Sequence, residues 1–345
     1  MDNQARGNYP KTATSNKMSN DQQIITTAIQ AARQGVALAN LSHWGLLKIS
    51  GDDRLRYLHN QSTNDFQKLQ PSQGCDTVFV TSTARTIDLA TAYVTENAVL
   101  VLVSPNRQQQ MLEWLDRFIF PMDRVELTDI SEESAIFTLI GPESDALLTK
   151  LGVEKSSNTA YASHQELMLG ELSVRLAIGS GLAMPGYTLI VPVAEASQLE
   201  QTLTQAGAIP LDNQTWEQLR IEQGRPVPDL ELTEDYNPLE AGLWQTISFD
   251  KGCYIGQETI ARLNTYKGVK QRLWGVNLNG SAQPGTVVTS EGTKVGTLTS
   301  FTNTDQGAFG LVYIRTKAGG VGLKVQVGDV EGEIVDVPFV THEYH

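Results

Sequence analysis

Residues 251–258 read KGCYIGQE and stand where the pattern of the chain changes. The residues before them, 245–249, alternate between polar and apolar, which predicts a strand. Residues 258–263 have the spacing of a helix. Cys253 is therefore expected in a loop between glycines, just ahead of the N-terminus of a helix.

The loop around Cys253 is a candidate reactive site. A helix N-terminus carries partial positive charge and Lys251 lies two residues away, so both are expected to favour the thiolate over the thiol. Gly252 and Gly256 allow backbone N–H groups to approach a ligand closely. A buried, inert cysteine beside a turn is the alternative that these residues leave open.

A second candidate site lies on a helix predicted to begin at Asp212, as its capping residue, and to stop at Gly224. Glu222 falls about 60° from Leu219 on the helical wheel, so its carboxylate borders the apolar face. A half-buried carboxylate accepts two parallel N–H bonds from a planar, amidine-like edge, and the pterin ring presents such an edge. The alternative is a salt bridge from Glu222 to Arg225.

The other elements mix helices and strands without a regular βαβ rhythm, which favours an α+β fold over a doubly wound sheet. Short glycine-rich strands dominate from about residue 272 and predict a separate antiparallel barrel or sandwich. Helices are predicted at 21–33, 54–60, 106–119, 144–151 and 195–206, and strands at 44–50, 77–81, 86–94, 98–103, 136–140, 172–178 and 187–191.

Composition excludes several classes of function. The 345 residues carry a net charge of −13, which argues against direct binding of nucleic acid, because that binding relies on Lys and Arg. The apolar run at 98–103 is far shorter than the roughly 20 residues of a membrane span. Cys75 and Cys253 are the only cysteines, too few to ligate an iron–sulfur cluster or a structural zinc.

Two isolated cysteines also point to a reducing compartment. Residues 1–20 are polar throughout and are predicted to be a disordered lead-in, with a short organellar transit peptide as the lesser alternative. The expected location is therefore the cytoplasm, and the alternative is the reducing lumen of an organelle.

Other motifs of known chemistry fail on inspection. Gly179-Ser180-Gly181 follows a predicted strand like the start of a dinucleotide fingerprint, but Met184 replaces the third glycine and Pro185 obstructs the required helix. The five histidines show no metal-binding spacing, and neither HExxH nor GxSxG occurs. The sequence therefore predicts no metal site and gives no support to a hydrolase.

Taken together, the motifs resemble a known family. KGCYIGQE resembles the signature K-G-C-Y-x-G-Q-E of the YgfZ-type proteins, a branch of the folate-binding superfamily of the glycine-cleavage T-protein. LRIEQG at 219–224 is similar to the L-R-x-E-x-G of that superfamily. Further segments follow in the order expected for it, namely 61–66, 139–142, 186–187 and 237–243.

The resemblance implies a GcvT-like α+β fold, in which intertwined antiparallel-sheet domains surround a central channel and a β-barrel follows. The corresponding division of the chain is a lead-in at 1–20, a folate-binding region at 21–265 and a barrel domain at 266–345. The folate-binding region would comprise two units, roughly 21–130 with 207–265, and 131–206.

The resemblance also implies a cofactor, tetrahydrofolate or a one-carbon-substituted folate. Glu222 would hold its pterin ring with help from Asp88, and Cys253 and Asp88 would be the catalytic residues. Arg262 would either face the ligand or order the loop by pairing with Glu258. The other signature residues expected at the cofactor are Lys251, Tyr254 and Gln257.

One departure weakens the expectation of aminomethyl transfer. The glycine-cleavage T-protein places two adjacent aspartates where this chain has Asp88 and Leu89. A methylene-transfer enzyme uses a carboxylate beside the reacting nitrogen, and such help is often worth about 10²-fold or more in rate. Half of the pair is missing here.

Three functions remain open at this point. The first, implied by the YgfZ resemblance, is a folate-dependent factor that supports iron–sulfur cluster assembly or repair in client proteins, with cluster-assembly factors as partners and an indirect effect on tRNA modification. The second is a folate-dependent aminomethyltransferase or other one-carbon transferase. The third is a non-catalytic binding module whose affinity for a partner depends on folate.

Overall fold

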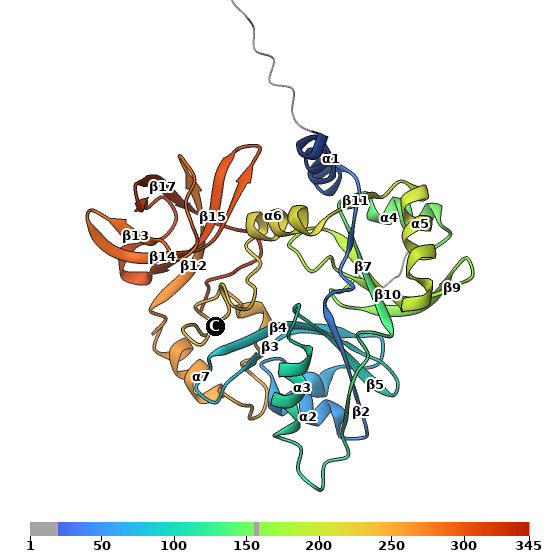
Figure 1. Ribbon diagram of the computed structural model, residues 1–345. Helices are drawn as coiled ribbons and strands as arrows, with labels where there is room; N and C mark the ends of the chain where they lie inside the picture. The colour runs from blue at the N-terminus through green and yellow to red at the C-terminus, as the bar shows by residue number, and fades with distance from the viewer. Residues whose placement is uncertain (1–19, 155–158, 345) are drawn as a thin grey trace, which may run out of the picture.

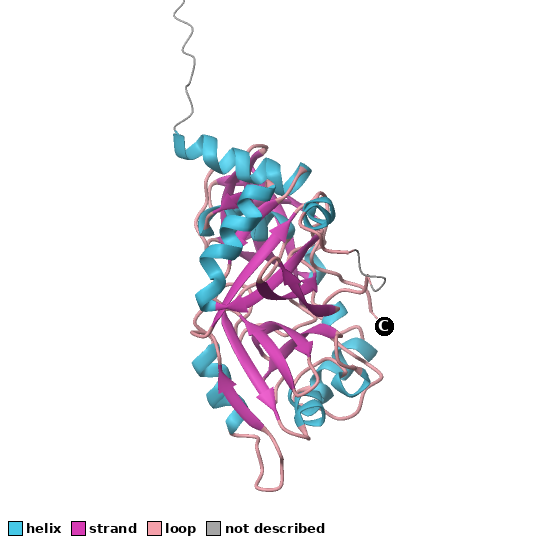
Figure 2. Ribbon diagram, turned by 90° about the vertical axis from the view of Figure 1, so that its right-hand side faces the viewer, coloured by secondary structure: helices cyan, strands magenta, loops and turns pink. Residues whose placement is uncertain are grey.

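The structure is a computed structural model that describes residues 20–154 and 159–344. The disordered lead-in is predicted for residues 1–20, of which 1–19 lie outside the described part. Figure 1 shows two sheets with their helices and a barrel grouped around a common middle. Figure 2 shows the same arrangement from the side, where it is narrower.

A five-stranded sheet forms the lower body in Figure 1, with strand order β3-β4-β5-β2-β6 and antiparallel pairing throughout. Its strands are buried on both faces along much of their length, which explains their near-continuous apolar sequence. The strands are β2 (Gly45–Ser50), β3 (Gly74–Val80), β4 (Thr86–Val94), β5 (Ala98–Val103) and β6 (Glu126–Asp129).

A six-stranded sheet forms the second body, in the order β11-β1-β7-β10-β9-β8. The strands are β1 (Ala37–Asn40), β7 (Ser134–Ile140), β8 (His164–Leu169), β9 (Leu172–Ile178), β10 (Gly186–Pro192) and β11 (Ile209–Leu211). β1 and β11 form its one parallel pair, although they are distant in sequence. The chain therefore enters this sheet, leaves it to build the five-stranded sheet and then returns, which intertwines the two bodies.

The C-terminal strands close into a barrel in the order β12-β15-β14-β13-β16-β17. They are β12 (Gln271–Leu278), β13 (Val287–Ser290), β14 (Thr293–Thr304), β15 (Gly307–Arg315), β16 (Lys324–Val327) and β17 (Val330–Val335). This barrel and the mixed α+β sheets confirm the predicted fold class. The finer division of residues 21–265 into two units stays a prediction.

Seven α-helices accompany the sheets in the described part of the chain. They are α1 (Asn20–Gln34), α2 (Arg54–Gln61), α3 (Gln108–Asp116), α4 (Ser144–Lys150), α5 (Ala196–Ala206), α6 (Asn213–Gln223) and α7 (Gln257–Thr265). None of the described helices is long and apolar enough to cross a membrane.

The predicted strand at 245–249 is wrong. Residues Trp244–Thr246 form a 3-10 turn, and Trp244 packs in a core cluster beneath the loops together with Leu239 and Tyr254. Polar and apolar residues alternate at 245–249 because some side chains of this loop are buried and others are exposed. The alternation does not come from the pleat of a sheet. No partner strand runs beside this segment in the part of the chain that the structure describes.

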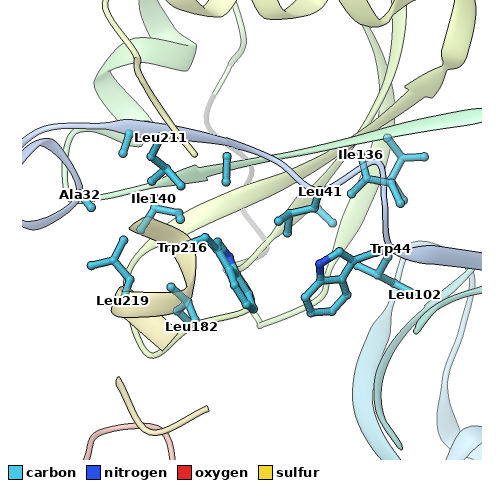
Figure 3. Close-up of a cluster of buried hydrophobic side chains, with 14 of the residues drawn as sticks. Ala32, Leu41, Trp44, Leu102, Ile136, Ile140, Leu182, Leu211, Trp216 and Leu219 are labelled. Carbon is cyan, nitrogen blue, oxygen red and sulfur yellow. The ribbon is translucent and has the colours of Figure 1, made fainter. Parts of the chain in front are cut away.

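The predicted boundaries of α6 are confirmed. The Asp212 side chain accepts a hydrogen bond from the Thr215 backbone N–H at 2.8 Å, and Gly224 ends the helix in the left-handed conformation. A Cβ atom at Gly224 would also meet Val337, so this position requires glycine. Trp216 and Leu219 point into the core cluster drawn in Figure 3, where Trp216 meets Trp44 edge-on at 5.5 Å between ring centroids.

A buried polar network joins α6 to the barrel. Arg220 and Glu231 are both fully buried and form an ion pair at 3.1 Å. Ser300 of β14 accepts a hydrogen bond from Arg220 at 2.9 Å and donates one to Glu231 at 2.6 Å. Because each charge is compensated, this network fixes the barrel against the helix that carries Glu222.

Candidate functional site

Lys251 of the signature points into the protein. Its Nζ donates hydrogen bonds to three backbone carbonyls, those of His59, Ser62 and Asn64, with distances of 2.5–2.8 Å. These carbonyls lie at the C-terminus of α2, so Lys251 satisfies groups that the end of a helix leaves open. Burial lowers the pKa of Lys251 to about 7, whereas three acceptors around the amine favour its charged form.

Other signature residues also make contacts inside the loop. Tyr254 is buried, and its ring lies 4.6 Å from the Lys251 ammonium in a cation–π contact. Gln257 begins α7 and donates to the Gly252 carbonyl at 3.3 Å. Gly256 has φ +83° and abuts Thr81, so it requires glycine. Cofactor binding by Lys251, Tyr254 and Gln257 stays a prediction.

Cys253 is exposed, as are Gly252 and Glu258 of the signature, and its thiol is free. It lies in the loop directly before α7, as the sequence predicts. The buried imidazole of His59 lies beneath this loop, with Nδ1 3.0 Å from Asp65. Burial lowers the pKa of His59, so this ring is neutral at pH 7. The second cysteine, Cys75, has a pKa raised by burial and is the less reactive thiol.

Glu222 lies at the wall of a cavity of about 500 Å³ between α6, α1 and the barrel. Its Oε2 accepts a hydrogen bond from Arg33 of α1 at 2.7 Å, and its Oε1 accepts one from Gln218 at 2.8 Å. Arg33 also holds Asp305 at 3.0 Å, in the turn between β14 and β15. The guanidinium thus bridges the Glu222 carboxylate and the barrel.

A salt bridge from Glu222 to Arg225, the alternative that the sequence leaves open, is not formed. The basic partner is Arg33, which is 189 residues away in sequence. Arg225 is instead buried between the rings of Trp44 and Phe339, each 5.3 Å from its guanidinium carbon. Helical position placed the Glu222 carboxylate at the edge of the apolar face, but only the tertiary fold selected its partner.

Asp88 is fully buried and both of its oxygens are engaged. Ser104 donates to it from the backbone N–H at 2.9 Å and from the hydroxyl at 2.6 Å. Burial raises the pKa of Asp88 to about 6, and the bonds from Ser104 oppose that rise. Ser104 lines a cavity of about 260 Å³ with Trp44 and Trp216. Asp88 therefore lies behind the wall of this cavity, and its catalytic and folate-binding roles stay predictions.

Arg262 lies on α7 and is exposed. Within the described part of the chain it forms no ion pair with Glu258, the partner that helical spacing suggested. Its expected role at the ligand is not tested by this geometry. The described residues hold no group of three His, Cys, Asp or Glu side chains that could bind a metal ion.

Sequence reasoning missed Asp76 of β3. Its Oδ1 accepts hydrogen bonds from Thr91 at 2.6 Å and from Tyr161 at 3.0 Å. Burial raises the pKa of Asp76, and the charge of Arg225 opposes that rise. A single acid near the start of an apolar strand gives no pattern, so the available signal was only that Asp is depleted in strands.

The chain is similar to known proteins over most of its length. Residues 6–251 match the family described as the GCVT N-terminal domain. A chloroplastic protein of Arabidopsis thaliana that is named as a transferase is 45% identical over 320 residues, which cover 92% of this chain and 74% of that protein. An aminomethyltransferase of Shouchella clausii is 29% identical, over 90% of this chain and 88% of that enzyme.

The fold is similar to that of a solved structure, the glycine cleavage system aminomethyltransferase T from Bartonella henselae. The TM-score is 0.80, and the match covers 93% of this chain and 90% of that chain. Sequence identity is 18%, so the likeness concerns the fold alone.

Proposed function

Because the chain belongs to the family of the GCVT N-terminal domain, we propose that it binds a reduced folate and transfers a one-carbon unit. Two aminomethyltransferases among its relatives match it over 88% and 89% of their own length. This coverage supports the proposed one-carbon transfer. Assignment to the YgfZ branch rests on the KGCYIGQE signature alone and is part of the proposal.

The single observation that carries the proposal is the contact of Glu222 with a planar cation at the wall of a cavity. A guanidinium edge presents N–H donors much as the amidine-like edge of a pterin does. Glu222 already accepts such a donor from Arg33 at 2.7 Å. A cavity of about 500 Å³ lies within the range typical of small-molecule sites. Asn277, Thr304 and Phe309 supply its polar and aromatic walls.

A ligand can take the place of Arg33 without leaving its charge unpaired. Arg33 holds Asp305 as well as Glu222, so it keeps one carboxylate when it releases the other. Asp305 is 57% exposed on its side chain, so the turn that carries it is free to adjust. Glu222 would hold the pterin, and the folate would supply the nitrogen atoms that accept the one-carbon unit.

Calorimetric titration with tetrahydrofolate tests this site. Glu222→Ala is expected to weaken binding at least 10-fold, because an interfacial charged hydrogen bond is worth about 1.5–3 kcal/mol. Arg33→Ala is expected to tighten binding, since it removes the group that competes for Glu222. Glu171→Ala, at an exposed turn, is the matched control. Equal affinity in the wild type and Glu222→Ala would remove Glu222 from the site.

A second assay tests whether the protein catalyses the proposed one-carbon transfer. Wild-type protein is incubated with tetrahydrofolate and either an aminomethylated carrier or a methylated amine, and 5,10-methylene-tetrahydrofolate is measured by its mass. Product above the background without protein is expected. Absence of product with every donor, in protein that binds folate, would favour the non-catalytic binding module instead.

An iron–sulfur role is the second candidate, and the exposed thiol of Cys253 favours it. Lys251 and Tyr254 secure the loop from inside, and Cys253 is exposed to solvent in that loop. A thiol so placed can contact a client protein or a cluster. The charge of the chain favours an indirect route to any effect on tRNA modification.

Complementation of a null strain tests that role. Cys253→Ala is expected to lower the activity of a cluster-dependent reporter enzyme to near the level of the null, whereas Cys75→Ala, at the less reactive thiol, leaves it unchanged. Full rescue by Cys253→Ala would exclude the thiol. Comparing the two variants separates loss of this thiol from a general effect of cysteine replacement.

The Arabidopsis relative is named as a chloroplastic protein, which is relevant to the cellular compartment of this chain. It supports the organelle alternative over the cytoplasm for proteins of this kind. We therefore propose a reducing organelle, with localisation of the full-length chain fused to a fluorescent protein as its test.

A further inference from the structure

Asp76 keeps one carboxylate oxygen free. Thr91 and Tyr161 both donate to Oδ1, at 2.6 Å and 3.0 Å. Within the described part of the chain, no residue donates a hydrogen bond to Oδ2. This contrasts with Asp88 and Glu222, whose carboxylates accept a protein donor on each oxygen. Asp76 therefore has the unused acceptor capacity that a ligand-binding acid needs.

Arg225, whose charge acts on Asp76, has a hydrogen-bond donor that no described residue uses. Its guanidinium is buried, and Nη1 donates to the Gly181 carbonyl at 2.8 Å. Its Nε–H is buried and has no hydrogen-bond partner among the described residues. The charge of Arg225 opposes the rise in the pKa of Asp76 that burial causes, yet the two described side chains do not form an ion pair within 4 Å. A buried donor without a partner is costly, which makes this side chain a candidate for a ligand contact.

The residues beside these groups are partly open to solvent. Tyr161, the donor to Asp76, is 42% exposed. Its ring lies against Gly179, where a Cβ atom would meet it at 2.4 Å. Gly181 has no atom within 4 Å of its Cβ position. Gly181, part of the segment that failed as a dinucleotide motif, thus leaves open space next to Arg225.

We propose that Asp76 and Arg225 form a polar subsite, Asp76 accepting from an N–H group of the ligand and Arg225 donating to an acceptor beside it. This subsite rests on the proposed folate function and deepens it, because it assigns a second polar contact to the bound reduced folate. Glu222 and Arg225 are three residues apart, so their Cα atoms are at most about 11 Å from one another. An elongated ligand is long enough to span that distance.

Asp76 differs from Asp88 because one of its carboxylate oxygens accepts no hydrogen bond from the described residues. Asp88 is enclosed behind Ser104, and Leu89 replaces its neighbour. Asp76 lies on β3, the strand paired with the one that carries both. The titratable groups that face Asp76 are Arg225, Tyr161 and Tyr93, with Cys75 beside it on its own strand.

Titration of tetrahydrofolate into wild type and Asp76→Asn between pH 5.5 and 8.5 tests the subsite. Because burial raises the pKa of Asp76, its carboxylate takes up a proton at a higher pH than an ordinary aspartate does. Wild-type affinity is therefore expected to fall towards low pH. Asp76→Asn is expected to bind at least 10-fold more weakly at pH 7.5 and to lack that part of the pH dependence.

Tyr161→Phe serves as a second variant, whose carboxylate is intact. It removes a donor that stabilises the charged form of Asp76, so the fall in affinity should move to higher pH. Asp336→Asn, at an exposed position near the C-terminus, is the matched control and should follow the wild type. Titration of the ligand itself is common to all four proteins and cancels in the comparison.

The outcomes separate the two proposals. If the wild type does not bind tetrahydrofolate, the proposed function fails and the subsite fails with it. If the wild type binds, but Asp76→Asn keeps both its affinity and its pH dependence, the subsite alone is overturned. Should Asp76→Asn fail to fold, an unshifted pH profile in Tyr161→Phe overturns the subsite.

Discussion

Replacing Glu231 with alanine is expected to lower the free energy of unfolding by about 3–5 kcal/mol. Glu231 is fully buried and compensates Arg220, which is fully buried as well. Without Glu231, the half-exposed Glu217 is the only acid among the described residues that still reaches Arg220. The hydroxyl of Ser300 and the backbone N–H of Val227 lose an acceptor at the same time.

The measurement is chemical denaturation of the whole chain, with one control that isolates the buried charge. The double variant Arg220→Met with Glu231→Leu removes both charges and fills their volume, so it is expected to be far more stable than Glu231→Ala. Because the network joins α6 to β14, we expect the packing of the barrel against α6 to loosen before other parts of the fold in Glu231→Ala. A loss below about 1 kcal/mol in Glu231→Ala would show that water or Glu217 replaces the lost carboxylate.

Lys251→Met has the second largest expected effect, a loss of about 2–4 kcal/mol in the free energy of unfolding. The variant keeps the length and apolar stem of the side chain but withdraws the donor from three carbonyls at the end of α2. These carbonyls are buried under the signature loop, where each lost bond costs more than it would at the surface. The loop that presents Cys253 is therefore expected to become mobile.

The pH dependence of this loss has a definite sign. Burial lowers the pKa of Lys251 from its ordinary value of 10.5 to about 7, so between these pH values the unfolded chain binds more protons than the folded one. The contribution of Lys251 to stability then rises with pH across that window. Lys251→Met lacks this rise, so its deficit relative to the wild type should grow between pH 7 and pH 9.

Urea denaturation at several pH values measures both parts of this prediction. Lys317→Met, at an exposed lysine of the barrel, is the matched control and should stay within about 0.5 kcal/mol of the wild type. A deficit that shrinks as the pH rises would contradict the proposed cause, since it would mean that the ammonium is not held in a buried place.

Local sequence determined most of the elements and the class of fold. The capping of α6 by Asp212 and its end at Gly224 follow from side-chain and backbone preferences within a few residues, and both were predicted. The short glycine-rich strands after residue 272 predicted an antiparallel barrel, which the structure confirms. The signature around Cys253 likewise predicted a loop before α7.

Elements whose partners are distant in sequence escaped prediction. β1 and β11 are short strands that become strands by pairing with each other across more than 160 residues. Residues 245–249 show the reverse case, because an alternating pattern met no partner strand and stayed a loop. Hydrogen-bonding partners make a strand, and a local pattern does not contain them.

The sequence by itself determined the candidate site residues, namely the acid of α6 and the thiol of KGCYIGQE, because residue type and helical position are local properties. Only the tertiary structure decided what each of them faces. It set Arg33 against Glu222, turned Lys251 inward onto α2 and left Asp76 with an open oxygen beside Arg225. The physical reason is that charge pairing and desolvation depend on distance in space, and the chain brings together groups separated by more than a hundred residues.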